Sequence, residues 1–265
     1  MKKYNFIDLF AGAGGLSEGF IRAGYNPIAH VEMNKDACDT LKTRTAYHYL
    51  KEKGRIDEYY KYLKGIISRD ELWAMVPSHL INSVINKEIS TKTLPDIFKQ
   101  IDSELGNKSV DLVVGGPPCQ AYSVAGRARK NMDDDPRNHL YKHYVEFLKK
   151  YKPKMFVFEN VPGILSASNG DYLEKIFNAV RKQGYELEKK ILNAKNFNVL
   201  QDRKRVIIIG WKKELNLSYP SFETKENNYE ILKDLFSDLP KLKSAQGEWK
   251  ASQYIKKTNS YLEST

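Results

Sequence analysis

The sequence predicts an α/β protein with a mostly parallel, doubly wound sheet whose last strand runs antiparallel. Short apolar segments alternate with amphipathic segments up to residue 211, which is the pattern of strands and helices in such folds. The run at 110–114 has the β-branched, mostly apolar character of a buried parallel strand, and it stops at two glycines and two prolines. Because ligands of open α/β sheets bind beyond the carboxyl ends of the strands, this sharp turn marks the expected site.

The predicted elements follow one another in the order that this fold requires. Strands are expected at 5–10, 27–32, 110–114 and 155–158, with helices at 16–23, 34–41, 139–151 and 172–183. The amphipathic pattern of the helix at 139–151 is formed by Leu140, Tyr144, Phe147, Leu148 and Tyr151. Two further apolar segments, 187–193 and 205–211, are expected to pair as strands, and a last helical piece is expected at 231–236.

Composition changes along the chain suggest how it is organised. Residues 1–211 are expected to form the domain that carries the chemistry. Within it, the stretch 42–106 is rich in lysine and tyrosine with helical spacing, so we expect an inserted helical lobe outside the sheet. Residues 212–265 are expected to form a polar C-terminal extension.

The charge balance favours a polyanionic partner. The chain carries 43 Lys and Arg against 33 Asp and Glu, a net charge of +10, and nucleic acid is the first candidate. A lysine-rich protein from an AT-rich genome would show the same excess. The two cysteines, Cys38 and Cys119, are too few for a disulfide framework, which favours a reducing cytoplasm. No apolar run has the length of a membrane span, and no metal ion is expected.

A glycine-rich loop joins the first predicted strand to the first helix and predicts a cofactor site. The segment Asp8-Leu9-Phe10-Ala11-Gly12-Ala13-Gly14-Gly15 lets the backbone approach a ligand at a helix N-terminus. Glu32 closes the second strand 20 residues after Gly12, the usual spacing for a carboxylate that binds ribose hydroxyls. The loop contains no lysine or arginine, so a nucleoside without phosphates fits better than a dinucleotide, and S-adenosylmethionine is such a ligand. A glycine turn that only packs helix on strand is the alternative.

Three separate segments are expected to bring reactive groups to the same edge of the sheet. Cys119 follows the turn after 110–114, Glu159 follows the strand at 155–158, and Arg203 precedes the strand at 205–211. If that last strand is antiparallel, its start also lies at the carboxyl edge. A thiolate, a carboxylic acid and a guanidinium suit attack on an electron-poor ring such as cytosine. Cys119 would add to C6, and Glu159 would supply the proton at N3. Arg203 would hold the base and balance charge, and Arg205 would support Glu159 or the base.

Each of these residues also has a plain structural interpretation. Cys119 alone would more often be a small buried apolar residue, Glu159 could cap a helix, and Arg203 could be a surface arginine. Only their joint placement favours the chemical interpretation.

With these motifs in view, the chain resembles the catalytic domain of the cytosine-C5 DNA methyltransferases, the restriction–modification type in particular. The matching blocks are DLFAGAGG, the strand end at Glu32, GGPPCQAYS, ENV, and QDRKR followed by VIIIG, in family order from Asp8 to Gly210. The resemblance implies a Rossmann-like, S-adenosylmethionine-dependent methyltransferase fold. It also implies methyl transfer from S-adenosylmethionine to C5 of a cytosine flipped out of double-stranded DNA.

The resemblance also assigns binding residues. Those implied for the cofactor are Phe10, Gly12, Gly14, Glu32, Met33, Glu88, Ile89, Pro118 and Leu140. The family usually has an aspartate before the isoleucine that contacts the adenine amino group, and Glu88-Ile89 is the best match here. Residues implied near the DNA are Gln120 and Ser123, with Arg127 and Arg129 in the loop 121–138. That loop would close over DNA as a lid, whereas its run Asp133-Asp134-Asp135 favours a disordered charged loop instead.

The segment that family members use to recognise the DNA sequence is not recognisable after Trp211, and neither is the final segment that completes their cofactor pocket. We therefore expect one part of a split or truncated enzyme, active with a second subunit that recognises the DNA sequence. The alternatives are a non-catalytic fragment that binds cofactor or DNA, and a tRNA cytosine-C5 methyltransferase of related fold. The Gln-Ala-Tyr-Ser that follows Cys119 resembles the bacterial DNA enzymes more than the tRNA branch.

Overall fold

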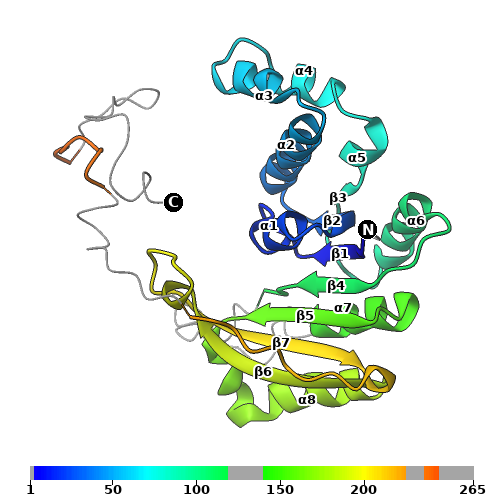
Figure 1. The fold of residues 1–265 in the computed structure, drawn as a ribbon. Helices are drawn as coiled ribbons and strands as arrows, with labels where there is room; N and C mark the ends of the chain where they lie inside the picture. The colour runs from blue at the N-terminus through cyan, green and yellow to red at the C-terminus, as the bar shows by residue number, and fades with distance from the viewer. Residues whose placement is uncertain (1–2, 119–139, 225–235, 245–265) are drawn as a thin grey trace. The chain divides into compact units, whose positions relative to one another are not determined.

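The computed structural model describes residues 3–118, 140–224 and 236–244, which include a seven-stranded sheet. The strand order is β3-β2-β1-β4-β5-β7-β6. Pairs β1–β2, β2–β3, β1–β4 and β4–β5 are parallel, whereas β5–β7 is antiparallel, so that the arrows of β5 and β7 point in opposite directions (Figure 1). The predicted doubly wound sheet with an antiparallel last strand is therefore confirmed. The strands are β1 (Asn5–Leu9), β2 (Asn26–Glu32), β3 (Val84–Asn86), β4 (Leu112–Gly115), β5 (Met155–Asn160), β6 (Tyr185–Asn193) and β7 (Lys204–Lys212).

Helices cover both faces of this sheet. The α-helices are α1 (Gly15–Arg22), α2 (Lys35–Glu52), α3 (Ile56–Leu63), α4 (Arg69–Ala74), α5 (Ser78–Asn82), α6 (Leu94–Leu105), α7 (Leu140–Tyr151) and α8 (Asp171–Arg181). Short 3-10 turns occupy η3 (Pro162–Leu165), η4 (Ala167–Gly170), η5 (Ala194–Asn196) and η6 (Lys213–Leu215). Helices α6, α7 and α8 bury their apolar residues in the larger core on one face, and α1 packs on the smaller core of the other face.

Alternation of side chains within the strands separates the two cores. In β5, Phe156 and Phe158 face the larger core, whereas Val157 faces the smaller one with Ile209 and Trp211. Successive strand residues point to opposite faces, so these central strands are apolar on both sides. This is the physical reason why their sequences lack the alternation of a half-exposed strand.

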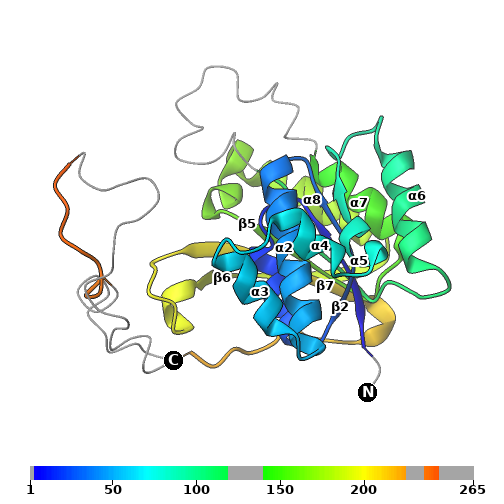
Figure 2. The same ribbon diagram turned by 90° about the horizontal axis from the view of Figure 1, so that it is seen from above.

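The prediction for 42–106 is wrong in part. Helix α2 does not end at residue 41 but continues to Glu52, and α3, α4 and α5 pack beside it as a small helical lobe (Figure 2). However, Val84–Asn86 forms β3, the edge strand of the sheet, and α6 packs against β2. A strand of only three residues shows no periodicity of its own, and its pairing with β2 is a long-range contact that local pattern does not reveal.

The chain divides into two compact units. One comprises residues 1–190 and 206–219, and the other comprises 191–205 and 220–265. In the second unit, Asn193 Nδ2 donates to Asp202 Oδ1 at 2.7 Å, and the rings of Phe197 and Phe222 meet edge to face at 6.0 Å. The boundaries expected for a domain at 1–211 and an extension at 212–265 stay a prediction. The helical piece expected at 231–236 lies almost wholly outside the described residues. No described helix has both the length and the apolar composition that crossing a bilayer requires.

A glycine in β7 permits the close packing of β5 against β7. A Cβ added to Gly210 would lie 1.9 Å from the Phe156 ring, in the larger core.

We expect Gly210→Ala to lower the free energy of unfolding by about 1–3 kcal/mol or more, because the Phe156 ring and the β7 backbone must move apart. Urea unfolding followed by circular dichroism measures this. Gly19→Ala is the control: an added Cβ there meets nothing within 4 Å and the residue lies in α1, so stability should hold or rise by up to about 1 kcal/mol. Equal stability of the two variants would contradict the packing argument.

Candidate active site and cofactor cavity

The loop between β1 and α1 is shaped by three positive φ angles. Phe10, Gly12 and Gly14 have φ of 54°, 53° and 84°, a region that favours glycine. An added Cβ at Gly14 would lie 2.8 Å from Leu41 Cδ2, so Gly14 allows α1 to pack on α2. Gly12 has open space around it, and its backbone N–H points to a carboxylate instead. The packing interpretation therefore accounts for Gly14 but not for Gly12.

That carboxylate belongs to Glu32, the last residue of β2. Its Oε2 accepts a hydrogen bond from Gly12 N at 2.8 Å, and its Oε1 accepts one from Asn34 N at 2.8 Å. Both oxygens are held in place by backbone donors, and each keeps lone-pair capacity for a further donor. The 20-residue spacing thus corresponds to a direct contact between the glycine loop and the end of β2.

Hydrogen bonds from Asn86, the last residue of β3, hold the backbone at the end of β2 in place. Asn86 Nδ2 donates to the carbonyls of Glu32 at 3.1 Å and Met33 at 2.9 Å. Lys87 N and Cys38 Sγ donate to the same Glu32 carbonyl at 3.0 and 3.3 Å. Sequence analysis missed Asn86 because it did not predict β3; an asparagine at a strand end beside a ligand loop is the signal that was present.

A cavity of about 520 Å³ opens beside these residues. All the residues predicted to contact a cofactor line it, except Gly12 and Gly14. Its lining is Phe10, Val31, Glu32, Met33, Asn34, Lys87, Glu88, Ile89, Ser90, Gly116, Pro118, Leu140 and His143. His143 was not predicted, although it follows Leu140 by three positions on α7 and so shares its helix face. Met33 remains 66% exposed, which leaves a large apolar side chain available to a ligand.

The turn after β4 lies against the end of β5. Gly116 approaches Glu159 so closely that an added Cβ would meet Oε2 at 2.7 Å and the carbonyl oxygen at 3.1 Å. The buried Asn160 donates from Nδ2 to the carbonyl of Pro117 at 3.0 Å, while its Oδ1 accepts from Val161 N at 2.9 Å. Asn160 was also missed as a site residue, although it follows Glu159 directly. The structure therefore brings Glu159 beside the turn that leads into Cys119.

Several predicted site residues belong to a part of the chain that the structure does not describe. Cys119, Gln120, Ser123, Arg127 and Arg129 lie outside the described residues, as does the loop 121–138. The predicted meeting of Cys119 with Glu159 and Arg203 therefore stays a prediction.

The antiparallel direction of β7 is as expected at this edge. Val206, near the start of β7, pairs with Asn160 at the end of β5. Arg203 and Arg205 precede and flank this point in the chain and belong to the second unit. There Arg203 N donates to Asn193 Oδ1 at 3.1 Å, and Arg205 Nη1 donates to the Lys204 carbonyl at 2.8 Å. Within the described ranges, no group of three or more His, Cys, Asp or Glu side chains could hold a metal ion.

Comparison with known proteins finds one family model that matches most of the chain. Residues 4–74 and 82–265 match the model of a family described as C-5 cytosine-specific DNA methylase. The chain is 38% identical over 275 residues to the type II methyltransferase M.Bpa9945I of Bacillus paralicheniformis, covering 91% of this chain and 62% of the relative. It is 32% identical over 241 residues to M1.HphI of Haemophilus parahaemolyticus, covering 91% of this chain and 54% of that protein.

Among solved structures, a protein described as a prophage-encoded DNA modification methyltransferase of E. coli is similar, with a TM-score of 0.62 and 26% identity. That match covers 91% of this chain and 56% of the other. The chain thus spans 54 to 62% of the length of these relatives.

Cys38, the cysteine that lies in the described part of the chain, is buried away from solvent. Cys38 is 1% exposed, and burial together with the Glu32 carboxylate raises the pKa of its thiol.

In the variant Cys119→Ser, Cys38 is the remaining thiol. Because the thiolate is the reactive form, we expect this variant to react very slowly with an aromatic disulfide reagent at pH 8 while folded, and rapidly in urea. Absorbance of the released thiolate measures both rates. Cys38→Ser serves as the companion variant, and fast labelling of Cys38 in the folded protein would contradict this assignment.

Proposed function

Because the chain belongs to the C-5 cytosine-specific DNA methylase family, we propose that it transfers a methyl group from S-adenosylmethionine to C5 of cytosine in double-stranded DNA. One observation carries this proposal. Gly116 and Pro118, from the turn that leads into Cys119, line the same cavity as Glu32 and Met33. A cofactor in that cavity and a base held at Cys119 would therefore be neighbours.

The residues around the cavity suit a nucleoside. The Glu32 carboxylate can accept hydrogen bonds from ribose hydroxyls while the Gly12 and Asn34 N–H groups hold it in place. Met33 and Ile89 offer apolar surface for an adenine ring, and Glu88 can accept from its amino group. When bound, S-adenosylmethionine would supply an electrophilic methyl group on a sulfonium.

Side chains of this chain would activate the cytosine for methyl transfer. The Cys119 thiolate adds to cytosine C6, and Glu159 supplies the proton that N3 gains. Arg203 would hold the base and balance the charge that develops on it, and Arg205 would support Glu159 or the base. The C6 addition makes C5 nucleophilic enough to take the methyl group. Loss of the C5 proton to solvent then expels the thiolate and re-forms the C5–C6 double bond. The N3 proton returns to Glu159, which leaves the neutral aromatic ring.

The DNA side of the reaction is also part of the proposal. A cytosine must leave the helix for a thiol to reach its C6, and Gln120, Ser123, Arg127 and Arg129 are proposed to contact the strand. The second subunit that recognises the DNA sequence stays a prediction, as does a cytoplasmic location.

Covalent trapping tests the proposal directly. Duplex DNA that contains 5-fluorocytosine lacks the C5 proton whose loss releases the enzyme, so we expect a stable protein–DNA adduct that requires S-adenosylmethionine. The adduct should disappear in Cys119→Ala and persist in Cys38→Ala, which removes the other thiol. Denaturing electrophoresis detects it. The chain is assayed alone and mixed with the products of adjacent genes, because a second subunit is expected.

Several results would contradict the proposal. A folded chain that forms no adduct with any of these mixtures would favour a non-catalytic binder. Transfer of tritiated methyl to tRNA but not to duplex DNA would favour the tRNA alternative. An adduct that still forms in Cys119→Ala would show that Cys119 is not the nucleophile.

Asn86 should contribute to cofactor affinity by positioning the backbone of Glu32 and Met33. Asn86→Ala removes two hydrogen bonds to those carbonyls, each contributing about 0.5–1.5 kcal/mol. We expect the Kd for S-adenosylmethionine to rise about tenfold, the change that corresponds to roughly 1.4 kcal/mol. Isothermal titration calorimetry, carried out well below the unfolding temperature, measures this Kd. The exposed Asn107 provides the control Asn107→Ala, and equal affinities of the two variants would exclude this role.

A further inference from the structure

Positively charged side chains gather at the edge of the sheet where the parallel strands begin, which is opposite the candidate site. We call this surface the amino-edge face. Its residues are all exposed: Lys3, Arg22, Lys51, Lys152, Lys154, Lys182 and Lys213. The candidate site at the other edge instead carries the carboxylates of Glu32, Glu88 and Glu159. The two edges are separated by the length of β5, six residues or about 17 Å.

One half of the amino-edge face is a row of lysines held by backbone pairing. Lys212 N donates to the Lys154 carbonyl at 3.0 Å, which sets the end of β7 beside the start of β5. Lys213 N donates to the Gly184 carbonyl at 3.2 Å, which brings it to the turn that begins at Lys182. Lys154, Lys182 and Lys213 therefore lie in the connections at the ends of neighbouring strands, where these backbone hydrogen bonds bring them together.

The half-buried Lys212 has a structural role in this row. Its Nζ donates to the Gln183 carbonyl at 2.9 Å and lies 4.0 Å from the centre of the Tyr185 ring. Burial lowers the pKa of Lys212; Glu214 opposes that shift, whereas the charge of the nearby Lys152 adds to it.

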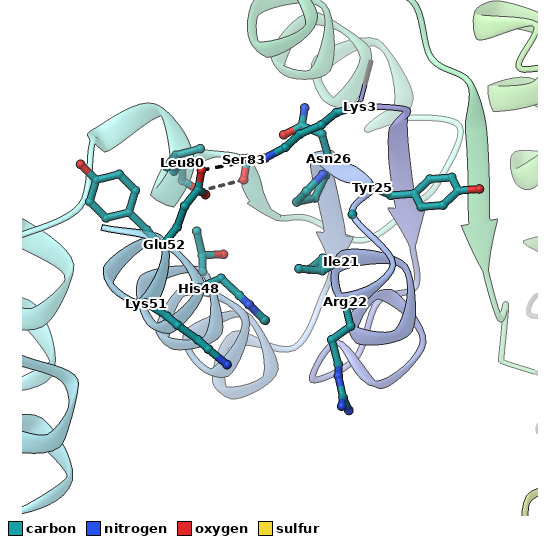
Figure 3. Close-up of a pocket in the computed structure, with 14 residues that line it drawn as sticks. Lys3, Ile21, Arg22, Tyr25, Asn26, His48, Lys51, Glu52, Leu80 and Ser83 are labelled. Carbon is teal, nitrogen blue, oxygen red and sulfur yellow. Dashed lines mark hydrogen bonds and ion pairs between the residues drawn. The ribbon is translucent and has the colours of Figure 1, made fainter. Parts of the chain in front are cut away.

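Aromatic rings connect this row to the other half of the face. Lys154 Nζ lies 5.7 Å from the centre of the Tyr4 ring, and the Tyr4 and Tyr25 rings are 5.7 Å apart. Tyr25 lines a cleft of about 510 Å³ between α1 and α2. Arg22 and Lys51 extend from these two helices to the same side of that cleft (Figure 3).

Acidic side chains on the amino-edge face are fewer and in part already engaged. Asp111 is buried and accepts from Lys154 Nζ at 2.9 Å and from Asn5 N at 3.0 Å. Glu52 lies 3.9 Å from Lys3 Nζ. Part of the positive charge balances the carbonyl ends of α7 and α8, which finish at this edge. Lys152 and Lys182 directly follow α7 and α8 and can serve that purpose, whereas Lys213 follows the strand β7 and does not.

We propose that the amino-edge face is a second, sequence-independent binding surface for the phosphate backbone of duplex DNA. Exposed lysines at the ends of neighbouring strands, with tyrosine rings beside them, provide the concentrated positive charge that binds a polyanion. A duplex at the amino-edge face would be a different DNA segment from the one that presents the target base. One molecule could then stay attached to DNA through this face while its opposite edge engages a site. The inference goes beyond methyl transfer and does not depend on it.

Charge reversal with a matched control tests the proposal. The test variant combines Lys152→Glu, Lys182→Glu and Lys213→Glu, which spares Lys154 because it pairs with Asp111. The control combines Lys64→Glu, Lys99→Glu and Lys175→Glu, exposed positions on other surfaces that change the net charge equally. Fluorescence anisotropy follows binding of a short non-cognate duplex as salt is raised. Loss of three phosphate contacts should reduce the slope of log K against log salt by about 2.7 in the test variant. The control should keep the slope of the parent chain.

Chemical footprinting gives a readout that needs no substitution. We expect the duplex to protect Lys152, Lys182 and Lys213 of the parent chain from acetylation by an N-hydroxysuccinimide ester, as measured by peptide mass spectrometry. Lys64, Lys99 and Lys175 should stay reactive. Equal protection of both sets, or equal slopes of the two variants, would overturn the proposal. So would tighter binding of single-stranded RNA than of the duplex with the same dependence on the three lysines. Thermal melts of both variants confirm that they are folded.

Discussion

The hydrogen bond from Asn160 Nδ2 to the carbonyl of Pro117 closes the carboxyl ends of β4 and β5 onto one another. The pairing of Gly115 with Phe158 brings the strands to this point, and the absence of a side chain at Gly116 lets its backbone lie against Glu159. Two prolines then limit the directions that the chain can take. The turn that leads into Cys119 is thus held beside the Glu159 carboxylate, which is one of the groups that the proposed chemistry requires.

On the cofactor side, Glu32 has the corresponding role. Its carboxylate is held by backbone N–H groups from the glycine loop and from Asn34, while its carbonyl accepts from Asn86, Lys87 and Cys38. The orientation of the acceptor is thus set before any ligand arrives, so that little ordering remains for the binding event. The edge strand β3 contributes to this arrangement through Asn86, although it is only three residues long.

The division of charge between the two sheet edges follows from the topology. In an α/β sheet the helices run opposite to the parallel strands, so that helix C-termini collect at the edge where the strands begin. Lysines and arginines are stabilised there by the helix dipoles, whereas carboxylates such as Glu32 and Glu159 lie at the other edge. The proposed chemistry on a base and the proposed contact with phosphates therefore fall at opposite edges of the sheet.

The sequence by itself determined the class of fold, the order of most strands and helices, and seven of the thirteen residues that line the cavity at the carboxyl edge of the sheet. The fold and the Glu32 contact depend on local patterns, namely apolar strand segments and a glycine loop, whereas most of the cavity residues were implied by the resemblance to a known family. Only the tertiary structure decided that Val84–Asn86 is a strand, that α2 continues to Glu52, and that Asn86 and Asn160 hold the walls of the site. Each of these depends on a partner far away in the chain, and no local pattern encodes the energy of a long-range hydrogen bond or strand pairing.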